Sequence, residues 1–99
     1  MKKILLVVSL LSGFNIAVAD DIAAGEALYN SRGCVGCHGA KGNSMIPMNP
    51  ILQGQHAQYL ISALNAYKSG TRNNPVMQGM IATLNDDQIK KISAYLAAQ

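Results

Sequence analysis

The two cysteines of this 99-residue chain, Cys34 and Cys37, stand three positions apart, and His38 follows the second one directly. Residues three apart on an α-helix lie on the same side of it, so both thiols can reach a single bound group. The imidazole of His38 is then placed to reach the centre of that group. This spacing predicts a chain that folds around one molecule held by both sulfur atoms.

C-x-x-C-H is the attachment signature of a c-type haem, which takes two thiols on its ring and an imidazole on its iron. Three other interpretations are weaker. A thioredoxin-like C-x-x-C needs a βαβ context that the chain lacks, and a disulfide between Cys34 and Cys37 would close a small, strained ring. A tetrahedral zinc site needs four ligands, and His56 is poorly spaced to complete one. We therefore predict one covalently bound haem c as the cofactor.

Residues 1–19 have the three-part pattern of a secretory signal peptide. Two lysines stand near the start, residues 4–16 are mostly apolar, and Ala17 and Ala19 are the small residues that a signal peptidase reads. The apolar stretch is shorter than the roughly 20 residues needed to cross a bilayer, so an uncleaved anchor is the weaker interpretation. We predict cleavage after Ala19, export to the periplasm, no stable membrane insertion afterwards, and one domain at residues 20–99.

The composition of the predicted domain favours a bound cofactor. Removing 19 residues leaves 80 of the 99 and takes away the single Phe, and the chain has no Trp. Domains of this size usually need a metal, disulfides or a cofactor in addition to a core. Six basic and five acidic residues remain, a net charge of +1. The basic residues form no patch or stripe, so we expect no nucleic-acid binding.

Apolar residues recur at helical spacing in three segments, residues 21–31, 56–68 and 86–98. Residues 39–55 and 70–80 between them are rich in Gly, Pro or Asn and are predicted as two long loops. Strand-like alternation of apolar and polar residues is absent from the sequence. The predicted fold class is all-α, with three main helices and long loops around one haem.

Local signals add detail to two of these helices. The second helix is expected to begin at the surface with His56 and to bury a stripe that runs from Tyr59 to Tyr67. The third is expected to begin with a capping box formed by Asn85 and Gln88.

Haem iron needs a second axial ligand opposite His38. Iron held by His and Met suits electron transfer because the pair raises the reduction potential. Met77 lies in a loop after Pro75, which fixes the backbone, so we predict His38 and Met77 as the iron ligands, with Met80 as the competitor. The other two methionines of residues 20–99 lie close to His38 in sequence and are weaker candidates: Met45 and Met48.

Together these residues resemble the class I c-type cytochromes, and most closely the small bacterial c4-like and c5-like branch. The resemblance covers essentially all of residues 20–99. Gly25-x-x-x-Tyr29 and Ile92-x-x-Tyr95 match the first and last helices of the family. In this family the two helices cross, and the small glycine lets the aromatic side chains interlock.

The resemblance also implies roles for single residues. Pro50 begins a stretch that matches the family's P-x-L-x-G, in which the proline carbonyl accepts a hydrogen bond from the proximal histidine, here His38. Met77 begins a Met-x-Gly-Met pattern in which the first Met is the axial ligand. Arg72 is implied as a partner of a haem propionate, and a solvated charge is the other interpretation. Proteins of the c4 type carry two such domains, whereas this chain has one haem motif.

The predicted function is a soluble, periplasmic one-electron carrier whose iron cycles between Fe(III) and Fe(II). It is not expected to be an enzyme, because no base or nucleophile accompanies the haem ligands. The resemblance implies a quinol-oxidising cytochrome complex or a dehydrogenase as donor, and a terminal oxidase or a peroxidase as acceptor. The alternatives are a haem subunit of an electron-transfer enzyme complex, a gas-binding haem protein and, with free thiols, a thiol oxidoreductase. The low net charge predicts docking through an uncharged patch, with Lys41 as a candidate at its rim.

Overall fold

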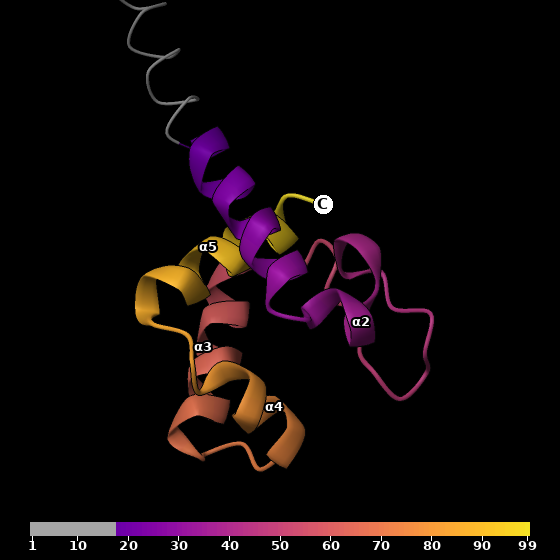
Figure 1. The fold of residues 1–99 in the computed structure, drawn as a ribbon, viewed down its shortest axis with the longest axis vertical. Coiled ribbons are helices and arrows are strands. Elements are labelled where there is room, and N and C mark those ends of the chain that lie inside the picture. The colour runs from indigo at the N-terminus through magenta and orange to yellow at the C-terminus, as the bar shows by residue number, and fades with distance from the viewer. Residues whose placement is uncertain (1–17) are drawn as a thin grey trace, which may run out of the picture.

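The structure is a computed structural model that describes residues 18–99. Over this range it contains helices and loops and no strand, which confirms the all-α prediction (Figure 1). The predicted signal peptide, residues 1–19, lies outside the described residues except for its last two. In chain order the elements are a helix at residues 18–31, α2 (Cys34–His38), the 3-10 helix η1 (Ala40–Gly42), α3 (Ala57–Ser69), α4 (Pro75–Ile81) and α5 (Asp86–Ala97).

The helix at residues 18–31 crosses α5 where Gly25 meets Tyr95, as the resemblance implied (Figure 1). A methyl group on Gly25 would lie 2.0 Å from the carbonyl oxygen of Lys91 and 2.8 Å from Cβ of Tyr95, so only a hydrogen atom fits there. One turn later, the rings of Tyr29 and Tyr95 have centroids 5.6 Å apart and are tilted by 48°, a separation at which aromatic rings attract. The crossing fixes the position from which the chain enters α2.

We expect Gly25→Ala to lower the free energy of unfolding of the haem-loaded protein by about 3 kcal/mol, because the added methyl group would force the two helices apart. Thermal unfolding measures the effect. Glu26→Ala, at the exposed neighbouring position, is the control and is expected to change stability by less than about 0.5 kcal/mol. Equal melting temperatures for the two variants would contradict the close approach of the helices.

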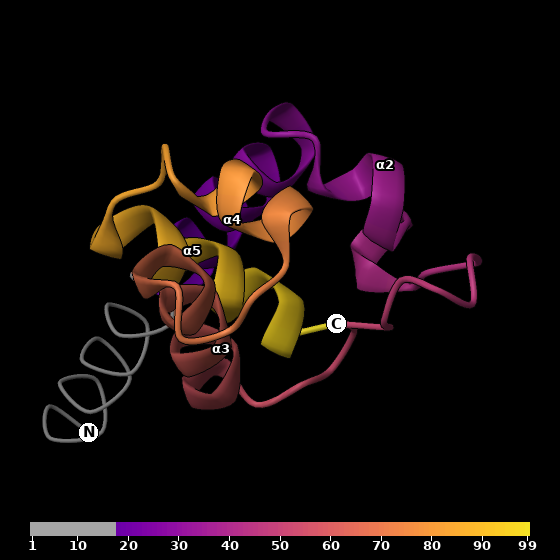
Figure 2. The same ribbon diagram turned by 90° about the horizontal axis from the view of Figure 1, so that it is seen from below.

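α3 packs against both α4 and α5 (Figure 2). The prediction that Tyr59 belongs to the buried stripe of α3 is wrong, because its side chain is 54% exposed. Leu60 and, one turn later, the partly buried Leu64 define the inner face, and Tyr59 lies to one side of it. The buried hydrophobic side chains are Tyr29, Leu60, Ile81, Leu84, Ile89, Ile92, Tyr95 and Leu96.

The predicted starts of α5 and α3 are present in the structure. The side chain of Asn85 accepts the backbone N–H of Gln88 at 2.8 Å, and the side chain of Gln88 accepts the backbone N–H of Asn85 at 3.0 Å. This reciprocal pair is the predicted capping box of α5. His56 is exposed at the start of α3, also as predicted.

The prediction of a continuous loop over residues 70–80 is wrong, because α4 (Pro75–Ile81) occupies its second half. Asn74 caps this helix by accepting the backbone N–H of Met77 at 3.1 Å. Pro75 occupies the first turn, where a helix tolerates the missing N–H. Both signals are visible in the sequence, but the helix has only 7 residues and contains Gly79, which weakens its periodicity.

Candidate functional site

The C-x-x-C-H motif forms a short helix of its own, α2. Gly33 precedes it with φ of 84°, a left-handed conformation that glycine adopts without strain, and so turns the chain sharply out of the preceding helix. Cys34 is half-buried, Cys37 is exposed, and both thiols are free. The two sulfur-bearing residues are therefore one helical turn apart and available to a common partner.

His38 is buried, with 7% of its surface exposed. Its Nδ1 lies 2.9 Å from the carbonyl oxygen of Pro50. A carbonyl can only accept, so Nδ1 carries the hydrogen in this pair and donates it. The second ring nitrogen, Nε2, then keeps its lone pair, which is the form in which an imidazole ligates a metal.

Burial raises the pKa of the Cys34 thiol, and the nearby Cys37 raises it further, whereas a local backbone hydrogen bond opposes the shift. Reactive cysteines of thiol oxidoreductases have the opposite property, a lowered pKa that favours the thiolate. The environment of Cys34 therefore gives no support to the thiol-oxidoreductase alternative.

Tyr29 ties the first described helix to the end of α2. Its hydroxyl donates a hydrogen bond to the carbonyl oxygen of Gly39 at 2.6 Å. Burial, assisted by the nearby Cys34, raises the pKa of Tyr29 to about 12, with a backbone hydrogen bond at Gly42 acting in the opposite direction. An ordinary tyrosine is already protonated at neutral pH, and the raised pKa of Tyr29 extends this form, with its hydrogen bond to Gly39, further into the alkaline range.

The two methionines of α4 have different surroundings. Met77 is partly buried, packs against the hydrophobic core, and has its backbone N–H fixed by Asn74. The terminal methyl group of Met80 lies against Gly33, 3.2 Å from where a Cβ on that glycine would be. Met80 therefore already packs against the turn that begins α2.

Residues 22–99 match the sequence model of the protein family described as Cytochrome c. The chain belongs to the cytochrome c family. It is 42% identical over 84 residues to cytochrome c-554(548) of Halomonas halodenitrificans, covering 82% of this chain and 99% of that protein. It is 38% identical over 101 residues to cytochrome c4 of Pseudomonas aeruginosa, covering 100% of this chain and 49% of that protein.

A solved structure gives the same result. Cytochrome c4 of Acidithiobacillus ferrooxidans superposes with a TM-score of 0.75 at 30% sequence identity, covering 80% of this chain and 50% of that one. The chain thus spans about half the length of these cytochrome c4 relatives and nearly all of cytochrome c-554(548). Its fold is the cytochrome c fold.

As a member of this family, the chain is a monohaem c-type cytochrome with covalently bound haem c, and it is an electron carrier rather than an enzyme. The residues of α2 fit the cofactor: Cys34 and Cys37 offer free thiols one turn apart, and the contact of Nδ1 of His38 with Pro50 leaves Nε2 as the ring nitrogen available to iron. When bound, the haem supplies the one-electron couple of its iron. What the polypeptide adds is the orientation of the ligands and the polarity around them.

Arg72 and His56 are two further candidate residues, and both lie outside α2. The guanidinium carbon of Arg72 lies 4.7 Å from the centroid of the Tyr67 ring, in a cation–π contact on an exposed surface. The predicted propionate contact of Arg72 stays a prediction. Over residues 18–99, no group of three or more His, Cys, Asp or Glu side chains could hold a metal ion, so the zinc interpretation that used His56 gains no support.

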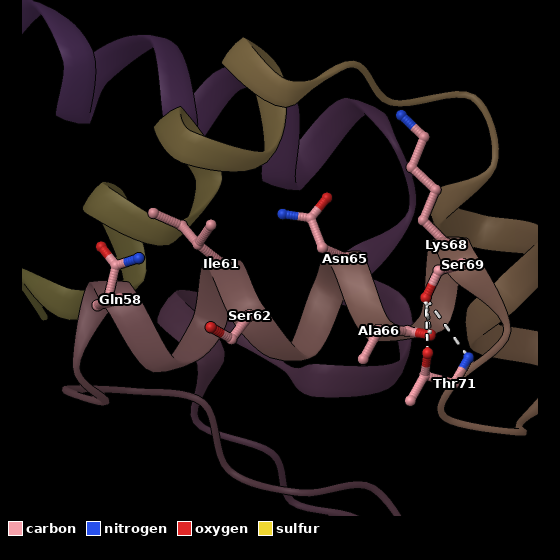
Figure 3. Close-up of a pocket in the computed structure, with 8 residues that line it drawn as sticks. All are labelled: Gln58, Ile61, Ser62, Asn65, Ala66, Lys68, Ser69 and Thr71. Atoms are coloured by element: carbon pink, nitrogen blue, oxygen red, sulfur yellow. Dashed lines mark hydrogen bonds between the residues drawn. The ribbon is translucent and has the colours of Figure 1, made fainter.

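A shallow hollow runs along the outer face of α3 (Figure 3). Its C-terminal end is polar, and there the hydroxyl of Ser69 lies 3.2 Å from the carbonyl of Ala66 and 3.0 Å from the hydroxyl of Thr71. These groups bond to one another, and the residues that line the hollow include no carboxylate, imidazole or thiol.

Asn49 is a site residue that the sequence did not predict. Its side-chain amide donates to the carbonyl oxygen of Cys37 at 3.0 Å. Together with the bond between His38 and Pro50, this contact fastens one loop to two residues of α2. The position of Asn49 next to Pro50 is the only signal in the sequence that could have indicated this contact.

Proposed function

We propose that residues 20–99 work as a periplasmic electron carrier, exported by residues 1–19 and cleaved after Ala19. None of the helices described in residues 18–99 has both the length and the apolar character to cross a bilayer. The proposal of export rests on the three-part pattern of the leader and on a cofactor that is attached to thiols.

We further propose the haem-holding set. Cys34 and Cys37 form the two thioether links, His38 and Met77 are the axial ligands, and Arg72 pairs with a propionate. The observation that carries this proposal is the 2.9 Å hydrogen bond from Nδ1 of His38 to Pro50, because it leaves the other nitrogen free for iron. It also fixes the orientation of the ring.

Fixed ligands suit electron transfer better than gas binding. The ring of His38 is buried and held by Pro50, and Met77 is partly buried with its backbone N–H capped by Asn74, so we expect little movement of either ligand when the charge of the site changes. A methionine opposite histidine also raises the reduction potential. A gas-binding protein, in contrast, needs an open or weakly held position on the iron.

The proposed partners are other redox proteins: a quinol-oxidising cytochrome complex or a dehydrogenase as donor, and a terminal oxidase or a peroxidase as acceptor. With a net charge of only +1 on residues 20–99, long-range steering toward them is expected to be weak.

Expression of the full 99-residue chain in a bacterium with a haem-attachment system tests the proposal. We expect the protein in the periplasmic fraction, with the mass of residues 20–99 plus one haem. Its ferrous absorption spectrum should stay unchanged under carbon monoxide at neutral pH, because both axial positions are filled by protein. A spectrum that shifts fully under carbon monoxide would favour the gas-binding alternative, and a mass that includes residues 1–19 would contradict cleavage.

A further inference from the structure

The residues on both sides of His38 are each bonded to a side chain from another part of the molecule. The carbonyl oxygen of Cys37 accepts a hydrogen bond from the side-chain amide of Asn49 at 3.0 Å. The carbonyl oxygen of Gly39 accepts one from the hydroxyl of Tyr29 at 2.6 Å. His38, the proposed iron ligand, therefore lies between two anchored neighbours.

Helix α2 is too short to hold residues 37–39 in place by itself. It has 5 residues and ends at His38, and the last carbonyl groups of a helix have no N–H partner within the helix. Gly39 leaves it with φ of 79°. The carbonyl of Gly39 also accepts the backbone N–H of Gly42, at 3.2 Å, a longer contact than the one with Tyr29. The position of these residues therefore depends on side chains from other elements.

The two donors are themselves held in place. Tyr29 is fully buried, and its ring lies with its centroid 5.6 Å from that of Tyr95. The backbone N–H of Asn49 donates to the carbonyl of Ile46 at 3.0 Å. Asn49 also directly precedes Pro50 in the chain. Its bond to α2 therefore fixes where the carbonyl of Pro50 lies relative to the imidazole.

The alignment of His38 with Pro50 affects the iron that the imidazole ligates. A hydrogen bond from one ring nitrogen to a carbonyl makes the other nitrogen a more basic ligand. A more basic ligand stabilises Fe(III) relative to Fe(II), because the ferric ion carries the higher charge. Hydrogen bonds weaken steeply when they are bent. A small displacement at this contact is therefore expected to raise the reduction potential.

We propose that Asn49 and Tyr29 are positioning residues for the imidazole of His38. By holding residues 37–39, they keep Nδ1 of the ring aligned with the carbonyl of Pro50. The imidazole thereby stays a strong donor to the iron, and the reduction potential is kept lower than it would be without them. This inference rests on the proposed function, in which His38 ligates the iron.

The variants Asn49→Ala and Tyr29→Phe, each in the haem-loaded protein, test the proposal. We expect the Nδ1 proton of His38 to exchange with deuterium about five- to tenfold faster in the ferrous variants, measured by NMR. The midpoint potential, measured by redox titration, should rise. At a fixed solution potential the ferrous-to-ferric ratio should increase roughly threefold, less than when a ligand loses its direct partner.

A general loss of stability would have different signatures. Water that reaches the haem favours Fe(III), because a more polar medium stabilises the higher charge, and so lowers the potential instead of raising it. The backbone N–H of Ile92, in the buried core of α5, exchanges when the core opens. We expect the Nδ1 proton of His38 to be accelerated more than this N–H.

Two matched variants serve as controls. Tyr95→Phe removes a hydroxyl from the same helix crossing, and this hydroxyl forms no hydrogen bond within residues 18–99. Asn43→Ala removes an exposed amide from the loop after η1, and the side chain of Asn43 also has no hydrogen-bond partner in that range. Both controls should keep the wild-type potential and the wild-type exchange of the Nδ1 proton.

The outcomes separate the positioning role from the proposed function. If the potential falls or stays unchanged in both Asn49→Ala and Tyr29→Phe, the positioning role is overturned and the electron carrier stands. Equal acceleration of the His38 proton and the Ile92 N–H would overturn it as well. A rise in only one variant would overturn the role of the other residue. A wild-type protein without a reversible one-electron couple would reject both the electron carrier and the positioning role.

Discussion

Replacing Cys34 and Cys37 together with alanine is expected to leave a chain that contains no haem and loses most of its helix content. The longest helices for which both ends are described are α3 and α5, with 13 and 12 residues. Isolated helices shorter than about 12–15 residues are marginal in water, so these depend on packing. The core on which they pack has, over residues 18–99, eight buried hydrophobic side chains, which is little for a segment that contains no Phe or Trp. Far-UV circular dichroism should show a mostly unfolded spectrum without a cooperative thermal transition.

The single variant Cys37→Ala is the control for this experiment. It keeps Cys34, which is half-buried, and therefore keeps one link through which haem can be attached. We expect native helix content and a lower melting temperature than that of the wild type. A double variant free of haem that still has native helix content would show that the polypeptide core is sufficient, and would reject the structural role of the haem.

The features that could be predicted from the sequence depend on short-range chemistry. The α2 helix follows from the spacing of Cys34 and Cys37, and the capping box follows from Asn85 and Gln88 three residues apart. The crossing of the first and last helices is a long-range feature. It was available only through the resemblance, which pairs Gly25 with the C-terminal helix.

The features that were missed depend on the path of loops through space. Asn49 reaches Cys37 across 12 positions, and Tyr29 reaches Gly39 across 10. No periodicity encodes such contacts, because they arise only once the loop after α2 has folded back. α4 was missed for a different reason. It is too short for a periodic pattern, and it lies in a segment whose Gly, Pro and Asn residues predict a loop.

Replacing Met77 with alanine is expected to remove the axial sulfur from the iron. In the ferric wild type, the proposed His–Met ligation should give a weak absorption band near the red end of the spectrum, and this band should be lost in the variant. The reduction potential should fall, because the thioether ligand raises it. The ferrous variant should also bind carbon monoxide, which the wild type is expected not to bind, because one axial position becomes available.

Met80→Ala is the matched variant, since Met80 lies on the same helix and is also partly buried. Its methyl group packs against Gly33, so its loss should reduce the free energy of unfolding by about 1–2 kcal/mol. The red band and the resistance to carbon monoxide should both remain. Met80→Ala is thus expected to affect stability and Met77→Ala to affect ligation.

The contrast between the two variants follows from how α4 is built. Asn74 and Pro75 fix the first turn, so Met77 is presented from a capped and rigid position. Met80 comes one turn later, and its terminal methyl group is already in contact with the backbone before α2. If the red band disappears in Met80→Ala and persists in Met77→Ala, the ligand is Met80, and the turn at Gly33 must then release its side chain. If both variants keep the band, the sulfur comes from outside α4, and the capped turn serves packing alone.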